Sequence, residues 1–123
     1  MNVLRNKEGS RGLDKVIVIS SAGLGGSDVD LGTKLMGLFL TKLRMQHSLP
    51  DAMVFYNDAV KLLAEDSPHR GSLVGLHEDG VDIVACGTCL KYYGLDEDAL
   101  VGRVTGMNEI VGMLLRASGV ITL

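Results

Sequence analysis

The sequence predicts a three-layer α/β fold built on a mainly parallel sheet of about five strands, and three observations predict it. Short apolar runs alternate along the chain with segments of helical periodicity, an order typical of parallel sheets covered by helices. The first run, residues 16–19, is continuously β-branched, as expected for a strand buried on both faces. The 123 residues, 46% of them hydrophobic, suffice for one core and are too few for two ordinary domains.

The first half of the chain is expected to hold two strands around one long helix. The glycine-rich segment 20–28 leads from the first strand into a helix that Ser27 or Asp28 can cap. Residues 52–56 form a second strand, which ends at Asn57. Apolar positions spaced for one face of the helix predict the side that it buries: Leu31, Leu35, Leu38, Phe39 and Leu43.

The middle of the chain is expected to hold one further helix and the third strand. Residues 58–66 fit either a short strand or a helical turn, so they are left unassigned. Ser67 followed by proline has the form of an N-cap and a first helical residue, and Gly80 stands where a helix would end. A helix is therefore predicted over residues 68–79, and residues 81–85 form the third strand.

The last third of the chain begins with Cys86-Gly87-Thr88-Cys89, directly after the third strand. No internal repeat or low-complexity tract interrupts the alternation of strands and helices. The remaining predicted elements are a short helix over residues 90–93 before Gly94, a brief strand over residues 99–105, a helix over residues 108–117 that Gly119 stops, and a last strand over residues 120–123.

Residues 1–14 are polar and without periodicity, and we interpret them as a flexible lead-in to a single domain over residues 15–123. The formal net charge is −3, but eight basic and thirteen acidic residues from Val16 onward leave the predicted body at −5. The chain has no tryptophan, few aromatic residues and no basic stripe. Because nucleic-acid binders depend on such features, we expect no nucleic-acid partner.

The compartment follows from the cysteine count and the apolar runs. Two cysteines cannot build the disulfide framework of a small secreted domain, and the N-terminus lacks the apolar segment of a signal peptide. Charged residues or glycines interrupt every apolar run before the roughly 18 residues that a membrane span needs. We therefore expect a soluble, cytoplasmic protein without a membrane partner.

In open α/β sheets the functional crevice lies at the carboxyl ends of the strands. Three loops are expected there: segment 20–28, Asn57 with the residues after it, and Cys86 to Cys89, which contains the strongest nucleophiles. A thiol of ordinary pKa, about 8.5, is only about 3% ionised at pH 7, and lowering that pKa to about 7 takes roughly 2 kcal/mol. A helix end supplies about 0.3 to 1 kcal/mol in ordinary geometry, so Thr88 and Lys91 are expected to assist.

Two thiols at this spacing favour a redox or sulfur-handling site, in which the sulfurs form a disulfide or pass a sulfur between them. Two buried structural thiols are the alternative. A zinc site is less compatible, because one pair of thiols supplies half of the ligands and the histidines at 47, 69 and 77 have no ligand spacing. The loop 23–27 matches neither common phosphate-binding motif. We therefore expect no metal and no organic cofactor.

Over about residues 15–123 the chain resembles the DsrE/DsrF-like superfamily. The specific part is segment 84–95, Val-Ala-Cys-Gly-Thr-Cys-Leu-Lys-Tyr-Tyr-Gly-Leu, supported by residues 54–57 and 101–105. Within this superfamily it most closely resembles the C-terminal domain of YedF-like proteins, which are linked to selenium metabolism. The resemblance implies a flavodoxin-like fold, assembly into homo-oligomers and a role in intracellular sulfur or selenium relay, including possible sulfurtransferase activity.

The resemblance also implies roles for site residues. In sulfur-transferring members a cysteine after the third strand carries a persulfide and lies eight residues before a glycine, an interval that Cys86 and Gly94 reproduce. It therefore implies Cys86 as the carrier and Cys89 as a resolving or second sulfur-holding thiol. Substrate-binding or orienting roles are expected for residues that end or follow the predicted strands: Ser27, Asn57, Gly87, Thr88 and Thr105.

A partner follows from the same resemblance. YedF-like proteins begin with a TusA-like sulfur-carrier domain, and residues 1–14 are too short to form one. We therefore expect either that the protein works with a separate TusA-like carrier or another persulfide donor, or that it is a reduced relative. Two other functions stay open at this point: a dithiol redox protein, and a non-catalytic oligomeric scaffold or small-ligand-binding protein.

Overall fold

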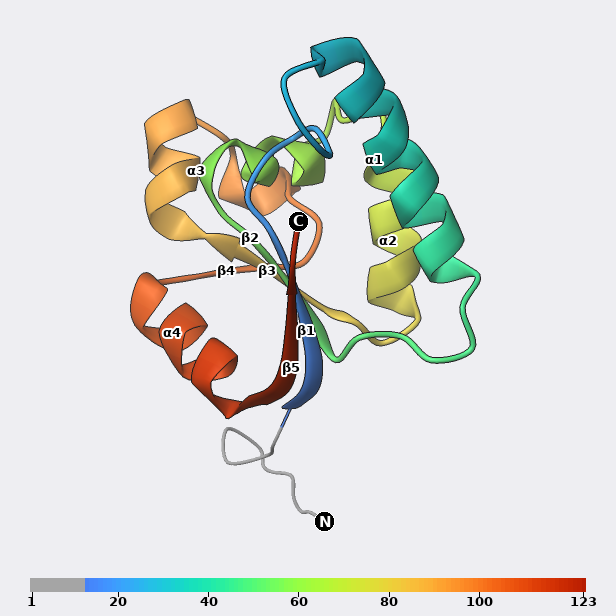
Figure 1. The fold of residues 1–123 in the computed structure, drawn as a ribbon. Coiled ribbons are helices and arrows are strands. Elements are labelled where there is room, and N and C mark those ends of the chain that lie inside the picture. Colours follow the sequence, from blue (N-terminus) through green and yellow to red (C-terminus); the bar gives the residue numbers. More distant parts are fainter. Residues whose placement is uncertain (1–12) are drawn as a thin grey trace.

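The computed structural model describes residues 13–123, which form a five-stranded parallel sheet with helices on both sides, so the predicted α/β class is confirmed (Figure 1). The strands lie in the order β4-β3-β2-β1-β5. In Figure 1, α1 and α2 stand on one side of the sheet and α4 on the other. In chain order the elements are β1 (Leu13–Ile19), α1 (Val29–Arg44), β2 (Ala52–Phe55), η2 (Asn57–Leu63), α2 (Arg70–Glu78), β3 (Asp82–Cys86), α3 (Gly87–Tyr93), η3 (Glu97–Ala99), β4 (Arg103–Thr105), α4 (Met107–Arg116) and β5 (Ala117–Thr122).

The central strands are buried on both faces, as the continuous apolar runs predict. Ile17, Met53 and Ile83 are neighbours across β1, β2 and β3, and they pack in the core that α1 and α2 cover. On the opposite face Val84 packs with Ile110 of α4. The sheet is therefore the middle of three layers.

β1 begins at Leu13, three residues earlier than predicted. Leu13 pairs with Ala117 of β5, and the backbone N–H of Asp14 donates to the Asp51 carboxylate at 2.6 Å. These two residues of the predicted lead-in therefore belong to the sheet. The rest of the lead-in, residues 1–12, lies outside the described residues.

Asp28, one of the two predicted caps, caps α1 by accepting the N–H of Leu31 at 3.0 Å. The predicted buried face is wrong for Leu31 and Leu38, which are 51% and 52% exposed. The loop before the helix gives the reason: Leu24 donates its N–H to the Gly32 carbonyl at 2.9 Å, so Gly32 faces inward against the loop. The stripe that is fully buried lies one position further along: Gly32, Met36 and Leu40, with Phe39 and Leu43 partly buried beside it.

The segment left unassigned forms the 3₁₀ helix η2, four residues of which are buried. α2 begins at Arg70, two residues later than predicted, because Ser67 does not cap it. The Ser67 hydroxyl instead accepts the N–H of His69 at 3.1 Å, in a turn that precedes the helix. Gly80, with φ 101°, follows the end of α2 as predicted.

The junction between β3 and α3 differs from the prediction by three residues. The helix begins at Gly87 instead of Leu90, so Cys86 is both the last residue of β3 and the N-cap of α3. Gly94 ends the helix in the left-handed conformation, with φ 66°, as predicted. Cys89 is thereby in the first turn of α3.

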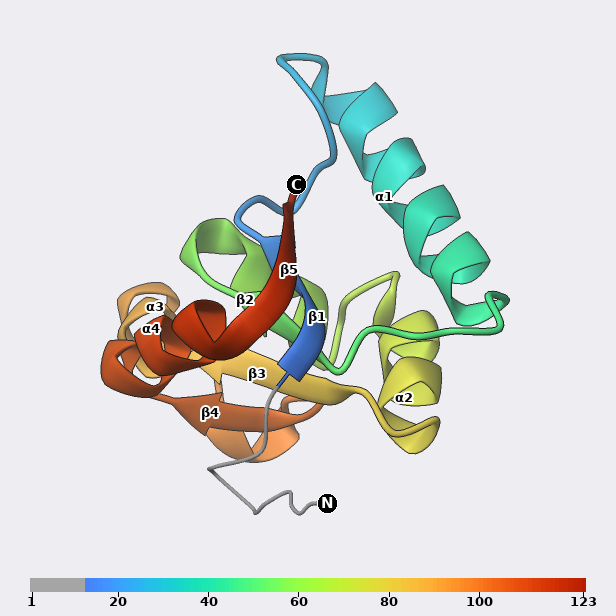
Figure 2. The ribbon, with the colours of Figure 1, turned by 60° about the horizontal axis from the view of Figure 1, so that its bottom comes forward.

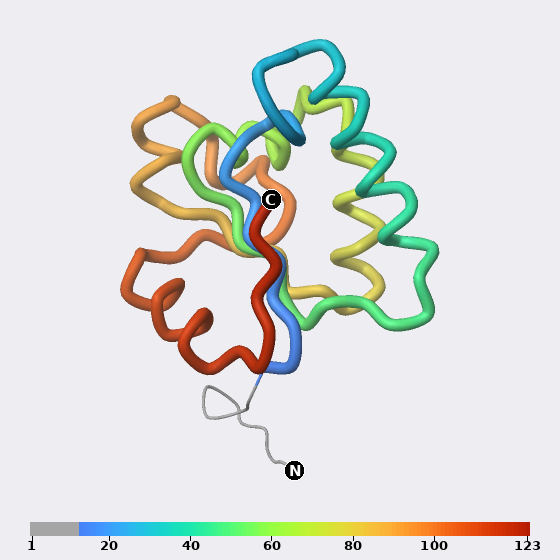
Figure 3. The backbone as a smooth tube through the Cα atoms, in the orientation of Figure 1, coloured from blue at the N-terminus to red at the C-terminus, as the bar shows by residue number. Residues whose placement is uncertain are grey.

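Two predictions for the end of the chain are wrong. The strand expected over residues 99–105 is limited to Arg103–Thr105, and Gly119 does not end the last helix. The chain passes directly from α4 into β5 at Ala117, as the tube in Figure 3 shows. Pairing with β1 decides this boundary, since Gly119 lies opposite Lys15 within the ladder. β5 forms an edge of the sheet beside β1 (Figure 2).

Candidate functional site

The two cysteines lie at the carboxyl end of β3 but in different surroundings. Cys86 is 1% exposed and packs with Val84, Ile110 and Met113 under α4. Cys89, one turn into α3, is partly exposed. The sequence predicted their place at the carboxyl edge of the sheet, whereas only the fold shows that the first thiol is enclosed and the second is accessible.

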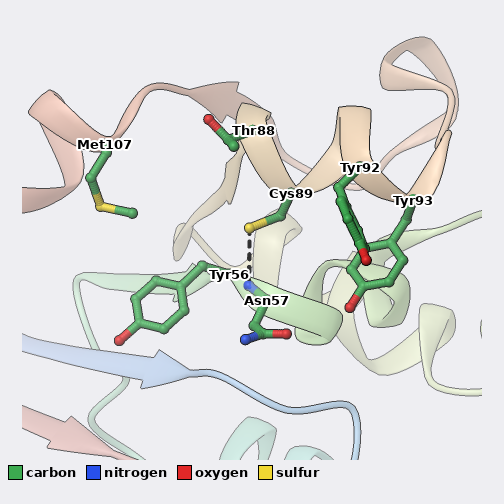
Figure 4. Close-up of a pocket in the computed structure, with 7 residues that line it drawn as sticks. All are labelled: Tyr56, Asn57, Thr88, Cys89, Tyr92, Tyr93 and Met107. Atoms are coloured by element: carbon green, nitrogen blue, oxygen red, sulfur yellow. Dashed lines mark hydrogen bonds between the residues drawn. The ribbon is translucent and has the colours of Figure 1, made fainter.

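Cys89 lines a cavity of about 470 Å³ that opens between α3, η2 and the start of α4 (Figure 4). Tyr56 and Met107 lie on one side of the Cys89 sulfur in this view, and Tyr92 and Tyr93 on the other. All three tyrosines of the chain line this one cavity. The full lining is Tyr56, Asn57, Thr88, Cys89, Tyr92, Tyr93 and Met107.

Asn57 contributes a directed hydrogen bond to the thiol. Its backbone N–H donates to the Cys89 Sγ at 3.1 Å, across 32 residues of sequence. Asn57 has φ 56° and is the one non-glycine residue with positive φ among residues 13–123. Its side chain accepts the N–H of Asp58 at 2.9 Å, a local bond that asparagine makes readily in this conformation.

The ionisation of Cys89 reflects opposing influences. Burial raises the pKa of its thiol, and the neighbouring Cys86 thiol raises that pKa further, whereas the N–H of Asn57 lowers it. The net shift is upward, so Cys89 is mostly a protonated thiol at neutral pH. Its reactivity as a nucleophile is therefore expected to increase as the pH rises.

The aromatic side chains of Tyr92 and Tyr93, which lie beside Cys89, are held in place by contacts within α3 and with η2. The Lys61 ammonium lies 4.4 Å from the centre of the Tyr93 ring, and Tyr92 meets Tyr93 edge to face at 5.1 Å between ring centres. Partial burial and the nearby Asp58 carboxylate raise the pKa of Tyr93, so its hydroxyl stays protonated at neutral pH.

The five residues predicted to bind or orient a substrate divide between two cavities and the open surface. Asn57 and Thr88 line the cavity with Cys89, and Thr88 also lines a second cavity of about 340 Å³ together with Gly87 and Thr105. Ser27 is exposed in the loop before α1 and lines neither of these cavities. The structure therefore brings Asn57 and Thr88 to the thiol and leaves Ser27 apart.

Thr105 belongs to a cluster of paired charges instead of the thiol cavity. Its hydroxyl donates to Glu109 at 2.6 Å, and Arg103 donates to Glu109 and to both carboxylate oxygens of Asp82 at 2.8 to 3.2 Å. Arg103 and Thr105 together lower the pKa of Glu109 to about 2. We call Asp82, Arg103, Thr105 and Glu109 the Arg103 cluster.

Sequence reasoning missed Tyr56, Tyr92, Tyr93 and Met107 as lining residues. Tyr92 and Tyr93 lie within segment 84–95, which carries the family resemblance, and this position could have indicated that they line the site. Tyr56 ends an apolar run, where a core role is the ordinary interpretation, and nothing in the sequence connects Met107 to the thiols.

Two structural properties concern metals and membranes. Within residues 13–123 no three His, Cys, Asp or Glu side chains come together in a way that could hold a metal ion. None of the helices in this part of the chain is long and apolar enough to cross a membrane.

Comparisons with known proteins identify the family. Three solved structures share the fold: MTH1491 from Methanobacterium thermoautotrophicum, a protein of unknown function (24% identity, TM-score 0.65, 89% of this chain and 98% of that chain covered), the ychN protein from E. coli (18%, 0.66, 89% and 99%), and BT1422 from Bacteroides thetaiotaomicron, also of unknown function (16%, 0.61, 89% and 95%). No curated protein matches the sequence. The model of the DsrE/DsrF-like family matches residues 14–123, so the chain belongs to the DsrE/DsrF-like family.

Proposed function

We propose that the protein relays sulfane sulfur, held as a persulfide on its CxxC pair, and that Cys89 is the thiol that receives it. The observation that carries this proposal is the position of Cys89: its Sγ lines a cavity of about 470 Å³ and accepts the N–H of Asn57 at 3.1 Å. Membership of the DsrE/DsrF-like family supports the sulfur chemistry.

The reaction consists of two nucleophilic displacements. The Cys89 thiolate attacks the outer sulfur of a donor persulfide, R–S–SH; a bond forms between Sγ and that sulfur, the donor S–S bond breaks, and its electron pair leaves on the donor thiolate. An acceptor thiolate then attacks the outer sulfur of the Cys89 persulfide, and the Cys89 thiolate leaves. One sulfur atom moves without net oxidation, so neither a metal nor an organic cofactor takes part. Selenium of the same oxidation state can follow the same two steps.

The division of roles between the thiols follows from their exposure. The resemblance of the sequence implied Cys86 as the carrier, but at 1% exposure its sulfur meets a bulky donor only when the local structure opens. Cys89 needs no such opening. We assign Cys86 the role of a second thiol: its thiolate can attack the outer sulfur of the Cys89 persulfide and take that sulfur, or attack the Cys89 Sγ, so that the persulfide S–S bond breaks, a disulfide forms and hydrosulfide leaves.

The donor that fits this chemistry is a persulfide on a small thiol or on a carrier protein of the TusA-like kind. A reducing compartment such as the cytoplasm would keep both cysteines as free thiols between transfers. Assembly into a homo-oligomer, which the resemblance of the sequence implies, is part of the same proposal.

The test is intact-mass analysis after incubation with glutathione persulfide, on the parent protein and on the Cys86→Ser and Cys89→Ser variants. We expect a gain of about 32 Da on the parent and on Cys86→Ser, and at least about tenfold less adduct on Cys89→Ser. Equal adduct on Cys89→Ser with loss on Cys86→Ser would transfer the carrier role to Cys86.

The two alternative functions give different masses in the same experiment. A loss of about 2 Da on the parent that needs both thiols, without a sulfur adduct on the Cys86→Ser variant, would indicate a dithiol redox protein. The absence of either change in a folded parent protein would contradict the relay and favour a scaffold or a binding protein. Thermal unfolding of each variant serves as the control for folding.

A further inference from the structure

The turn at Asn57 is strained, and the structure around it holds that strain in place. A left-handed backbone is disfavoured for residues with a Cβ, although asparagine tolerates it better than most. Asn57 itself is exposed, so burial of its own side chain does not impose the conformation. The flanking residues impose this conformation, because Phe55 and Ala59 on either side of Asn57 are fully buried.

Further contacts fix η2 relative to the sheet. Tyr56 donates its N–H to the carbonyl of Ile19, which keeps the chain extended up to the turn. At the far end of η2, the carbonyl of Leu63 accepts from the backbone N–H of Val101 at 3.1 Å. The chain is therefore anchored before and after Asn57, and the abrupt change of direction between these anchors is concentrated at this one residue.

This turn directs the backbone N–H of Asn57 toward the Cys89 sulfur. We propose that Asn57 is a positioning residue for Cys89: its left-handed backbone holds the N–H on Sγ and so stabilises the thiolate, both as attacking group and as leaving group. This inference rests on the proposed function for its role in sulfur transfer. Strained backbone geometry persists where the surroundings over-determine it, and functional sites are where it concentrates.

Independent features of the site agree with this assignment. Burial and the Cys86 thiol both oppose ionisation of Cys89, and the N–H of Asn57 acts in the opposite direction. A hydrogen bond to a charged sulfur is stronger than one to a neutral thiol, so the bond gains most when the thiolate forms. The amide side chain of Asn57 accepts from Asp58, which leaves the contact with the thiol to the backbone.

The experiment compares Asn57→Gly with Asn57→Ala in a Cys86→Ala background, where Cys89 is the one remaining thiol. Both substitutions remove the amide side chain, but glycine adopts the left-handed conformation freely and alanine does not. The readout is the rate of alkylation by iodoacetamide between about pH 7 and 11, with thermal unfolding over the same pH range as the control. The midpoint of the pH profile reports thiolate stability, and the plateau at high pH reports access to the sulfur.

We expect Asn57→Ala to raise the midpoint and to slow alkylation at pH 7 by about 2- to 10-fold, and Asn57→Gly to restore the parental midpoint. Asn57→Ser, which can still accept the N–H of Asp58, is a second variant and should resemble alanine. A parental midpoint in both the alanine and serine variants would overturn the proposal. An equal shift in the glycine and alanine variants would also overturn it, because the side chain and not the backbone would then be responsible.

The readout separates this inference from the proposed function. Alkylation needs no persulfide, so the midpoints can follow the expected order even when no sulfur adduct forms, and the positioning of Cys89 then stands while the relay fails. Sulfur adducts with unshifted midpoints would give the opposite result, a relay in which Asn57 has no part.

Discussion

Two groups of residues lie around β3, the Arg103 cluster and the thiol cavity, and they differ in how completely their polar groups are paired. In the Arg103 cluster, Arg103 donates to both Asp82 and Glu109, so charges of opposite sign satisfy one another. In the thiol cavity, Cys89 has one backbone donor and an open cavity in front of its sulfur. The Arg103 cluster joins β3, β4 and α4, whereas the thiol cavity lies between α3, η2 and the start of α4. Both groups contain residues that the sequence marked as candidates.

This difference in pairing determines which of the two groups can react with a substrate. A carboxylate or guanidinium that is fully paired has few lone pairs or protons left for a substrate, so the Arg103 cluster stabilises the short edge strand β4 against β3 and α4. Cys89 keeps its lone pairs and its access to solvent. Changes in the Arg103 cluster should therefore affect stability and spare thiol reactivity.

The largest effect is expected at Gly102, which begins the turn into β4. Gly102 has φ 84°, and a Cβ there would meet the carbonyl and the side chain of Ile83 in β3. We expect Gly102→Ala to lower the free energy of unfolding by about 3 kcal/mol, the sum of a left-handed alanine and a clash with backbone. Urea unfolding measures the loss.

Gly25→Ala is the matched control for this substitution. Gly25 also has positive φ, at 97°, but a Cβ there meets nothing within 4 Å. The expected loss is about 1 kcal/mol, from the backbone conformation alone. Equal losses in the two variants would show that the contact with Ile83 is not the cause.

A smaller effect is expected from Arg103→Ala. The Arg103 side chain is 43% exposed, and solvent weakens its ion pairs, so we expect a loss of about 1 kcal/mol in the free energy of unfolding at pH 7. Arg103→Lys keeps the charge but not the two-pronged bond to Asp82, and should recover less than half of that loss. Iodoacetamide should alkylate Cys89 at the parental rate in both variants; a slower rate would mean that the two groups are coupled.

The pH dependence of unfolding tests the pairing of charges in the Arg103 cluster. The cluster depresses the pKa of Glu109 from 4.5 to about 2 in the folded state. Its stabilisation is therefore fully present above pH 4.5 and is lost as the pH falls toward about 2. In Arg103→Ala this loss between pH 4.5 and 2 should shrink, which urea unfolding at several pH values would measure.

The smallest effect is expected at Ser27. Its side chain is exposed and lies outside both cavities next to α3, so Ser27→Ala should change the free energy of unfolding by less than about 0.5 kcal/mol. The rate of sulfur transfer to Cys89 and the rate at which iodoacetamide alkylates Cys89 should be unchanged in this variant. Slower transfer in this variant would give the loop before α1 a role that its position does not indicate.

Several parts of the fold were predictable because they depend on local chemistry. Asp28 caps α1 and Gly94 ends α3, as predicted, since capping and left-handed turns select particular residue types. The buried face of α1 differs from the prediction by one position, because the loop before the helix packs against Gly32 and leaves Leu31 exposed. Gly119 resembled a helix stop, but pairing with β1 placed it inside a strand.

The amino-acid sequence was sufficient to predict the alternation of strands and helices, the parallel sheet, and the position of both thiols at the carboxyl end of the third strand. These features follow from periodicity and from residue preferences within short segments. The tertiary structure alone decided that Cys86 is enclosed and Cys89 faces a cavity, and that the N–H of Asn57 meets a sulfur 32 residues away. Burial and hydrogen bonding of this kind depend on elements distant in the chain, and no local pattern encodes which of two nearby thiols they enclose.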